Sequence, residues 1–572
     1  MVLRSLSWLP GLQTLLHYRR EWLLHDVVAG LALSAILVPV GMGYAQASGV
    51  DAIYGLYATI VPLLVYALFG PSRILVLGPD STLAAVIAAV VLPMAAGSPE
   101  RAAQLAALLA LLAGAFSLLI GLARLGMLAD LLSKPIRIGF LNAVALTVLV
   151  GQTPKVLGIS VSADDLPQKV IGIVSSLLAG QVNAVALALG GSGLVCILVF
   201  KKLRPKWPAL LAVVVLSTLI SWGLDLEHTA GLRVLGSLPQ GLPRADLQGV
   251  NLQDAIALLP AALMVALLVF TDTSVLSRSL ALRGGYQINA NQEMMALGLA
   301  NLGAGVFQGF PVSASSSRTP VAEAAGAKTQ LTGIVGALAI AALLVWAPDL
   351  LSELPSAVLG AVVIAACLSF ADFPAMLQLY RLRKVEFALS AVSFLGVAFV
   401  GVIQGIVISI ALALLVLVWN AWHPHYTTLV RVDGAKGYHD VKRHPEGRQI
   451  PGLVLFRWDE QLFFANAEVF REQAVQAVLH APPPVRRLTV VSDAITDVDV
   501  TAADAIVNLH NELQKLGVEL RFAGMKGPVK DRLRHYGTLD TIGHDIFSAT
   551  AGYAVNQYRQ TFKVDWKDWD ES

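Results

Sequence analysis

Long apolar runs are the feature of this sequence that most constrains its fold. Runs at 105–122, 207–222, 331–346 and 395–419 approach or reach the length that crosses the hydrocarbon core of a bilayer. The whole chain of 572 residues is 56% hydrophobic and only 14% charged, which is far more apolar than a soluble domain. Gly, Pro and charged residues divide the part before residue 424 into about fourteen such segments. We therefore predict an α-helical membrane protein with about 14 transmembrane segments.

Basic residues orient these segments. The clusters that separate segments are Arg19 with Arg20, Lys201 with Lys202, and Arg381 with Arg383 and Lys384. They all fall on one side if the segments alternate, and the positive-inside rule makes that side cytoplasmic. We expect a multi-pass protein of the cell inner (cytoplasmic) membrane with both termini cytoplasmic. The net charge is only +2, and no long basic run occurs, so no nucleic-acid partner is expected beside the lipid bilayer.

Composition divides the chain into three parts. Residues 1–24 mix tryptophan, leucine and arginine, a pattern typical of an amphipathic segment at the cytoplasmic membrane surface. Residues 25–423 form the predicted transmembrane domain. Residues 424–572 alternate strand patterns with a helical pattern at 501–516, which predicts a compact cytoplasmic α/β domain. The predicted strands are 452–458, 487–491 and 518–522.

Two breaks rich in Pro and small polar residues interrupt the apolar segments, at 77–82 and at 310–319, and each precedes a short Ala-rich helical pattern. An odd number of segments separates the breaks, so their orientations in the membrane are opposite. We interpret them as equivalent elements of two inverted seven-span repeats. A half-helix that begins at such a break points its free N–H groups and its positive dipole end into a cavity. Two facing N-termini therefore predict an anion site.

The second break adds charge and hydrogen-bond donors to this predicted site. Arg318 supplies a guanidinium, and Ser315, Ser316 and Ser317 supply hydroxyl groups. Together they suit a desolvated oxyanion. The alternative is an arginine that extends to the lipid headgroups.

Asp272 is a carboxylate within the predicted eighth segment, directly before Thr273. A charge at that depth needs a partner, which could be Na⁺, a proton or Arg318. We assign Asp272 and Thr273 as candidate cation-coupling residues. The alternative is a structural ion pair between Asp272 and Arg278 or Arg283.

Three further residues belong to the predicted site. Asp80 and Ser81 lie at the mouth of the first half-helix, where a carboxylate is a good N-cap but repels an anion unless a cation accompanies it. Tyr44 is either a packing residue of its helix or an aromatic wall of the site.

At these residues the chain resembles the SulP anion permeases, which include bacterial bicarbonate and dicarboxylate carriers, and the resemblance covers nearly the whole chain. The stretches that carry it are 39–45 (PVGMGYA), 53–57 (IYGLY), 66–73 (YALFGPSR), 77–79 (LGP), 291–293 (NQE), 298–302 (GLANL) and 317–319 (SRT). The resemblance implies a uracil-permease-like arrangement of core and gate domains, with the substrate between the third and tenth spans. It also implies a homodimer and an elevator-type motion. The family's anion-site positions fall on Tyr44, the residues near Asp80, Ser317 and Arg318, and its acidic position in the eighth span falls on Asp272.

The C-terminal part resembles the STAS domain of the same family. The matching stretches are 462–467 (LFFANA), 497–501 (DVDVT) and 522–529 (FAGMKGPV). STAS domains resemble anti-sigma-factor antagonists, whose phosphorylated residue falls on Thr501. This residue is a candidate regulatory site, or simply a helix N-cap.

Our leading hypothesis is a secondary active transporter of a small oxyanion, bicarbonate or sulfate, coupled to Na⁺ or H⁺. Many relatives have Gln where this chain has Val40 and an apolar residue where it has Asp80, and the added carboxylate favours cation coupling. An exchanger of chloride, bicarbonate or dicarboxylates with the same fold is one alternative, and a membrane-anchored STAS signalling protein is another. No catalytic constellation is present, so we expect no enzyme. We also expect no cofactor, with Na⁺ as a possible co-transported ion.

Overall fold

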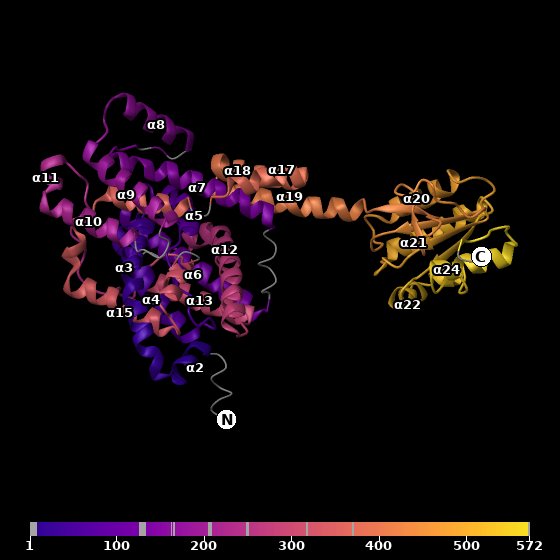
Figure 1. Ribbon diagram of the computed structural model, residues 1–572, viewed down its shortest axis with the longest axis horizontal. Coiled ribbons are helices and arrows are strands. Elements are labelled where there is room, and N and C mark those ends of the chain that lie inside the picture. The colour runs from indigo at the N-terminus through magenta and orange to yellow at the C-terminus, as the bar shows by residue number, and fades with distance from the viewer. Residues whose placement is uncertain are drawn as a thin grey trace. The chain divides into compact units, whose positions relative to one another are not determined.

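The computed structural model describes residues 9–124, 133–161, 163, 166–203, 209–246, 251–315, 318–368 and 371–569. The chain divides into two compact units, Met1–Leu412 and Ala413–Ser572, and the division falls within a helix (Figure 1). The first unit is built of helices with two very short strands, and the second contains a larger sheet.

The first unit begins with the following elements: α2 (Pro10–Leu16), η2 (Arg20–Trp22), α3 (Leu23–Ala47), α4 (Ala52–Phe69), β1 (Leu77–Gly78), α5 (Ser81–Ala95), α6 (Pro99–Leu122), α7 (Lys134–Leu157), α8 (Leu166–Leu178), α9 (Ala184–Leu203), α10 (Ala209–Gly223) and α11 (Leu226–Ala230). It continues with α12 (Leu252–Gly284), α13 (Ala290–Val306), β2 (Ser313–Ala314), α14 (Arg318–Ala324), α15 (Leu331–Trp346), η4 (Pro348–Leu351), α16 (Ser356–Cys367), α17 (Phe373–Leu382), α18 (Lys384–Leu395), η5 (Gly396–Val400) and α19 (Val402–Trp422).

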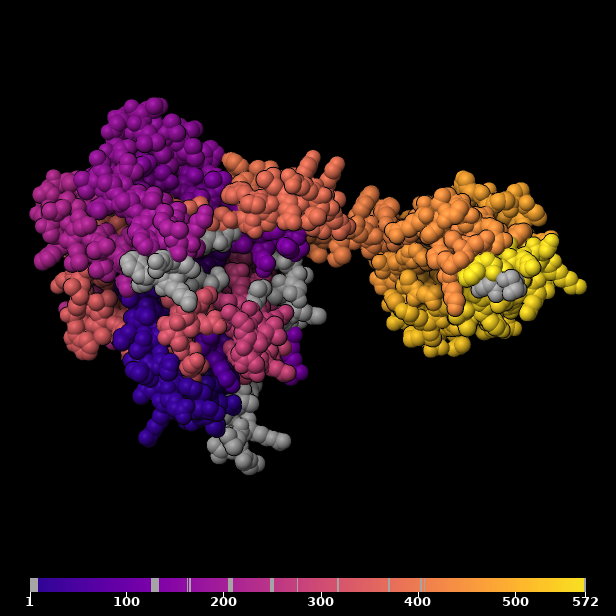
Figure 2. Space-filling model, in the orientation of Figure 1, coloured from indigo at the N-terminus to yellow at the C-terminus, as the bar shows by residue number. Residues whose placement is uncertain are grey.

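Several of these helices have the length and surface of membrane spans. Within the described residues, six helices are long and apolar enough to cross a bilayer, and further apolar helices are shorter. Large apolar side chains lie exposed on their outer faces, among them Leu119 of α6, Val195 of α9 and Leu219 of α10. Figure 2 shows the surface of this unit, with α8 at one edge in purple. Apolar side chains exposed to lipid carry no hydration penalty, whereas the same side chains exposed to water do.

The helices of the first unit pack into two groups. In one group α3 packs against α4 and α15, while α6 packs against α12 and α13. In the other group α7 packs against α16 and α18, while α9 packs against α10 and α16. The groups meet where α3 contacts α16 and where α5 contacts α7. The first unit thus contains two helix groups that share one boundary.

The two breaks form the two short strands of this unit. β1 and β2 pair antiparallel, with Leu77 opposite Ala314 and Gly78 opposite Ser313. Each strand follows two long helices, α3 and α4 in one case and α12 and α13 in the other, and each precedes a short helix. Antiparallel pairing of equivalent strands is the arrangement that an inverted repeat requires, because a two-fold axis in the membrane plane reverses the chain direction.

One predicted span is wrong. The apolar run 395–419 is not a single helix, because α18 ends at Leu395, η5 follows, and α19 begins only after Gly401. Gly405 of α19 lies so close to η5 that a Cβ atom there would stand 2.3 Å from the backbone nitrogen of Val397. Hydropathy does not reveal such a turn, because the turn consists of glycine and apolar residues and is therefore as apolar as the helices that it joins.

The second unit contains a six-stranded sheet in the order β4-β3-β5-β6-β7-β8. Strands β5 to β8 are parallel, and β3 is antiparallel to both of its neighbours. The elements are β3 (Tyr426–Arg431), β4 (Tyr438–Asp440), β5 (Leu453–Trp458), α20 (Ala467–Leu479), β6 (Arg487–Val491), α21 (Val500–Lys515), β7 (Glu519–Ala523), α22 (Gly527–His535), α23 (Thr538–Ile542), β8 (Phe547–Ser548) and α24 (Ala551–Phe562). The predicted α/β domain is confirmed.

The alternation of β5 explains why helices cover both faces of this sheet. Phe456 and Trp458 pack with Phe470 of α20 on one face, whereas Leu455 packs with Tyr558 of α24 on the other. Successive side chains of a strand point to opposite faces, so a strand with apolar residues on both faces requires cover on both sides.

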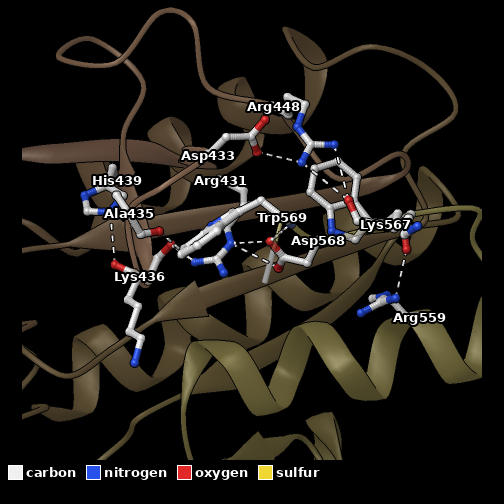
Figure 3. A network of polar contacts seen from close by, with 12 residues as sticks. Arg431, Asp433, Ala435, Lys436, His439, Arg448, Arg559, Lys567, Asp568 and Trp569 are labelled. Carbon is white, nitrogen blue, oxygen red and sulfur yellow. Dashed lines mark hydrogen bonds and ion pairs between the residues drawn. The ribbon is translucent and has the colours of Figure 1, made fainter. Parts of the chain in front are cut away.

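A C-terminal strap, residues 563–569, is held by arginines against the β3–β4 side of the sheet (Figure 3). Arg431 Nε donates to both carboxylate oxygens of Asp568, at 2.8 and 3.0 Å. Arg431 Nη1 also donates to the carbonyl oxygens of Ala435 and Gly437, at 3.1 and 2.8 Å. One guanidinium therefore fixes both the strap and the turn between β3 and β4.

Candidate functional site

Side chains from neighbouring helices hold both breaks in their extended conformation. Asn301 of α13 donates from Nδ2 to the carbonyl oxygen of Val312 at 3.1 Å, and its Oδ1 accepts from the Val312 amide at 2.8 Å. Gln330 Nε2 donates to the carbonyl oxygens of Ser72 and Leu75, each at 2.9 Å. These bonds satisfy backbone groups that a continuous helix would otherwise pair within the membrane.

Arg318 is the first residue of α14 and only 2% of its surface is exposed. Within the described part of the chain, none of its three guanidinium nitrogens has a hydrogen-bond partner. The guanidinium lies against β1, since a Cβ atom on Gly78 would stand 3.4 Å from Arg318 Nη1. An arginine that extends to the lipid headgroups does not fit this burial. A buried cation without a partner is costly and calls for an anion.

The N-terminus of α5 faces the same place. Asp80 is its N-cap, and the Oδ2 atom of Asp80 accepts from the Thr82 amide at 3.0 Å and from Thr82 Oγ1 at 2.7 Å. Ser81 begins the helix and is buried. Asp80 and Arg318 interact electrostatically without forming an ion pair in the described residues. α5 has 15 residues but α14 only 7, so α5 supplies most of the helix-dipole potential and α14 contributes mainly its guanidinium.

Tyr44 of α3 completes one side of this region. It is buried, and it lies close enough to Ser81, Asp80 and Arg318 to interact with all three. The position fits the interpretation of Tyr44 as a wall of the site better than that of a simple packing residue.

Asp272 of α12 is connected to Asp80 through a hydroxyl group. Thr82 Oγ1 donates its proton to Asp80 Oδ2 at 2.7 Å and also lies 3.5 Å from Asp272 Oδ2, so one hydroxyl bridges the two carboxylates. Among the described residues, no lysine or arginine forms an ion pair with Asp272. Arg283 pairs instead with Glu323, at 3.3 Å. The structural ion pair that we considered for Asp272 is therefore absent from the described residues.

Thr273 lies next to Asp272 and is fully buried. Its Oγ1 atom has no hydrogen-bond partner within the described residues, and the same is true of Ser274 Oγ. Buried hydroxyl groups without partners are rare. Hydroxyl oxygens beside a carboxylate are ligands that suit a hard cation.

The serine cluster of the second break is only partly described. Ser315 Oγ accepts from the Arg318 amide at 3.2 Å, so this hydroxyl caps the start of α14. Ser316 and Ser317 were also predicted as site residues, and they lie outside the described residues.

Sequence reasoning missed two residues at the site and one that holds the chain before β1. Gly78 leaves room for the guanidinium, and Thr82 connects the two carboxylates. Both residues belong to the first break, so the stretch 77–82 already contained them. Glu293 of α13 is buried and accepts from Tyr66 OH and from Ser72 Oγ, shortly before β1. Its signal was a carboxylate in an apolar helical pattern.

Thr501 does not lie at the helix N-cap position that we considered. The N-cap of α21 is Asp499, whose Oδ1 accepts from the Ala502 amide at 2.8 Å. Thr501 lies exposed in the first turn, so it is not the cap. Phosphorylation of Thr501 stays a prediction.

A buried cation at two breaks in an apolar helical unit is the arrangement expected of a membrane transporter of anions. Comparison with known proteins is in agreement. The model of the sulfate permease family matches residues 23–393, and that of the STAS domain matches residues 444–552. A probable sulfate transporter of Mycobacterium tuberculosis is 37% identical over 97% of this chain and 99% of its own length. The chain belongs to the sulfate permease family, and it is a multi-pass transporter with a STAS domain rather than an enzyme.

Two solved structures share the fold. The murine solute carrier 26 family member A9 anion transporter gives a TM-score of 0.89, with 23% identity, over 98% of this chain and 95% of that one. The transmembrane domain of the cyanobacterial bicarbonate transporter BicA gives a TM-score of 0.58, with 22% identity, over 69% of this chain and 98% of that one.

Proposed function

We propose that this chain is a secondary active transporter that carries a small oxyanion across the cytoplasmic membrane together with Na⁺ or H⁺. The observation that carries the proposal is the buried guanidinium of Arg318, which has no partner in the described residues. Its planar fork of donors matches the paired oxygens of sulfate or bicarbonate. The N-terminus of α5 and the Tyr44 hydroxyl would bind the remaining oxygens.

Sulfate and bicarbonate are the preferred substrates within this proposal. The name of the mycobacterial relative supports sulfate, and the description of the cyanobacterial structure supports bicarbonate. Both anions present two or more oxygens in the geometry that an arginine binds in pairs.

Asp272 is the proposed coupling residue. It lacks an ion pair in the described residues, and Thr82 places it one hydroxyl away from Asp80 at the anion site. A cation or proton bound at Asp272 offsets the two carboxylates and favours entry of the anion, and the coupling is reciprocal. Na⁺ or H⁺ therefore enters as a second substrate.

The proposal includes an elevator-type motion, a homodimer and cytoplasmic termini. Support for the motion comes from the two helix groups, because β1 and β2 contact α4 and α12 of the first group. Movement of this group along the second would carry the site with it.

The test is uptake of labelled sulfate, bicarbonate and succinate into proteoliposomes, with a Na⁺ gradient and then with a pH gradient. Wild-type protein should accumulate one oxyanion when one of the gradients is imposed. Asp272→Asn keeps the size of the side chain but removes its charge, so the stimulation by the gradient should disappear. Asp349→Asn, at an exposed carboxylate of η4, is the matched control and should behave as wild type.

Three outcomes would contradict the proposal. Normal gradient stimulation of Asp272→Asn would remove Asp272 as the coupling residue. Uptake that always requires a counter-anion would indicate an exchanger. Absence of flux with every anion would favour a signalling protein.

A further inference from the structure

A cavity of about 710 Å³ lies away from Arg318, at the end of the first unit where α3 finishes. Its walls come from the C-terminal ends of α3, α5 and α7, from the N-terminal ends of α4 and α6, and from residues 235–239. Our orientation of the chain assigns this end to the outside of the membrane. The cavity lies at the boundary between the two helix groups, because α7 belongs to one group and α3, α4 and α6 to the other.

Lys155 of α7 is the cationic side chain among the described residues that line this cavity. Its Nζ atom donates to Gln46 Oε1 at 3.2 Å. It forms no ion pair within the described residues, and a lysine ammonium carries three donors. Two donors of a largely buried cation are therefore left for a ligand or for water in the cavity.

Helix ends add to the positive potential of the same wall. α4 has 18 residues and α6 has 24, and both begin at the cavity. The Asp51 carboxylate makes no capping hydrogen bond at the start of α4, and the side chain is exposed. Water screens the exposed Asp51 carboxylate more strongly than the partly buried Lys155 ammonium. The interior of the cavity consequently favours an anion, although the exposed carboxylates of Asp51 and Glu100 stand at the starts of α4 and α6.

We propose that Lys155 and the N-termini of α4 and α6 form a second anion site, which captures the transported oxyanion at the outer face before it reaches Arg318. An anion bound there accepts hydrogen bonds from the Lys155 ammonium and replaces Gln46 of α3 as its acceptor. The Lys155–Gln46 bond links the two helix groups, so capture also releases one polar contact across their boundary. The inference rests on the proposed transport function and adds an entry site to it.

The test compares the two faces of the same protein. Uptake of labelled sulfate is measured in right-side-out and in inverted membrane vesicles from cells that express the full chain. Lys155→Gln should raise the KM at the outer face by about tenfold, since the charged donor is lost, while the KM at the inner face and kcat stay unchanged. Lys155→Arg keeps the charge and should retain most of the affinity.

Two further variants make the result specific. Arg244→Gln removes a positive charge from the segment before α12, and this residue does not line the cavity. The segment lies at the same end of the unit, because Asp254 at the start of α12 pairs with Arg101 at the start of α6. Arg244→Gln should leave both KM values unchanged. Gln46→Glu keeps the lysine but gives it a carboxylate partner, so it should raise the outer KM as Lys155→Gln does.

The inference is overturned if Lys155→Gln shows wild-type KM at both faces, or if KM rises equally at both. A KM that rises for Arg244→Gln as much as for Lys155→Gln would also overturn it, because surface charge alone would then explain the effect. Wild-type vesicles that accumulate no oxyanion under either gradient would overturn the proposed function together with this inference.

Discussion

Arg318 shows how a single residue can be costly for stability and necessary for function. Removing a guanidinium from water without giving it an acceptor costs several kcal/mol in a folded protein. The structure buries this group to 2% exposure and gives it no partner in the described residues. The cost is recovered only when an anion binds, so the empty site should be less stable than the loaded one.

Arg318→Ala should therefore separate binding from stability. Affinity for labelled sulfate should fall by at least tenfold, because a hydrogen bond from a charged donor contributes about 1.5–3 kcal/mol. Arg318→Lys keeps the charge but loses the paired donors, so its affinity for sulfate should lie between that of the wild type and that of Arg318→Ala. The melting temperature of the ligand-free Arg318→Ala protein should not fall. Wild-type affinity in this folded variant would exclude Arg318 from the site.

The candidate residues that could be predicted from the sequence are those whose charge is out of place in an apolar segment. Asp272 was assigned in this way, whereas Asp80 and Arg318 were assigned because each lies at a break that contains a proline. Gly78 and Thr82 could not be assigned roles, because their roles depend on which segments meet in space. A glycine beside a guanidinium is visible only after β1 and β2 are paired.

At the scale of elements, the two breaks were predictable but their pairing was not. Pro and small polar residues mark where a helix must stop. Each strand has only two residues, too few for an alternating pattern that would specify a partner or a register. The prediction of one span at 395–419 was wrong for a related reason, since hydropathy measures composition and carries no information on where the chain changes direction. The glycines at 396, 401 and 405 were its only signal.

The C-terminal strap offers a test of one element in the second unit. Arg431→Met removes the donors to Asp568, Ala435 and Gly437 together. Asp568→Asn weakens only the first contact, so it should have the smaller effect. We expect faster hydrogen exchange in the strap and in the β3–β4 turn for Arg431→Met, and in the strap alone for Asp568→Asn. Breaking a buried ion pair costs about 3–5 kcal/mol, which is enough to change exchange by orders of magnitude.

Arg534→Met is the matched control for this comparison. Its partner Asp531 and Arg534 itself are both largely exposed, with side-chain exposures of 73% and 64%. Exposed ion pairs contribute little, so exchange in the strap should equal that of the wild type. Exchange in the Arg431→Met strap equal to that of the wild type would show that other contacts hold the strap, among them the hydrogen bond from Arg448 to the Lys567 carbonyl oxygen.

At the scale of the whole molecule, each of the two units has its own apolar core. The cluster that surrounds the anion site lies within residues 29–398, while those of the sheet unit lie within residues 429–566. Every described residue of the candidate site, from Tyr44 to Arg318, belongs to the first unit. Selectivity for one anion over another is a difference in binding free energy at those residues. We therefore expect no side chain of the second unit's described residues to contribute to that difference.

Truncation after His423 should therefore leave the order of preference among sulfate, bicarbonate and succinate unchanged. The cut falls between the end of α19 and the start of β3, so it removes the sheet unit without dividing a described element. The rate of uptake and the oligomeric state can change, because a STAS domain without a part in the site is free to act on assembly or regulation. Competition between labelled and unlabelled anions gives the preference independently of the rate, and Arg318→Ala in the truncated chain serves as the binding-deficient control. A truncated protein that is folded by size-exclusion chromatography but prefers a different anion would show that the second unit shapes the site, and the assignment of selectivity to Tyr44, Ser81 and Arg318 would then be wrong.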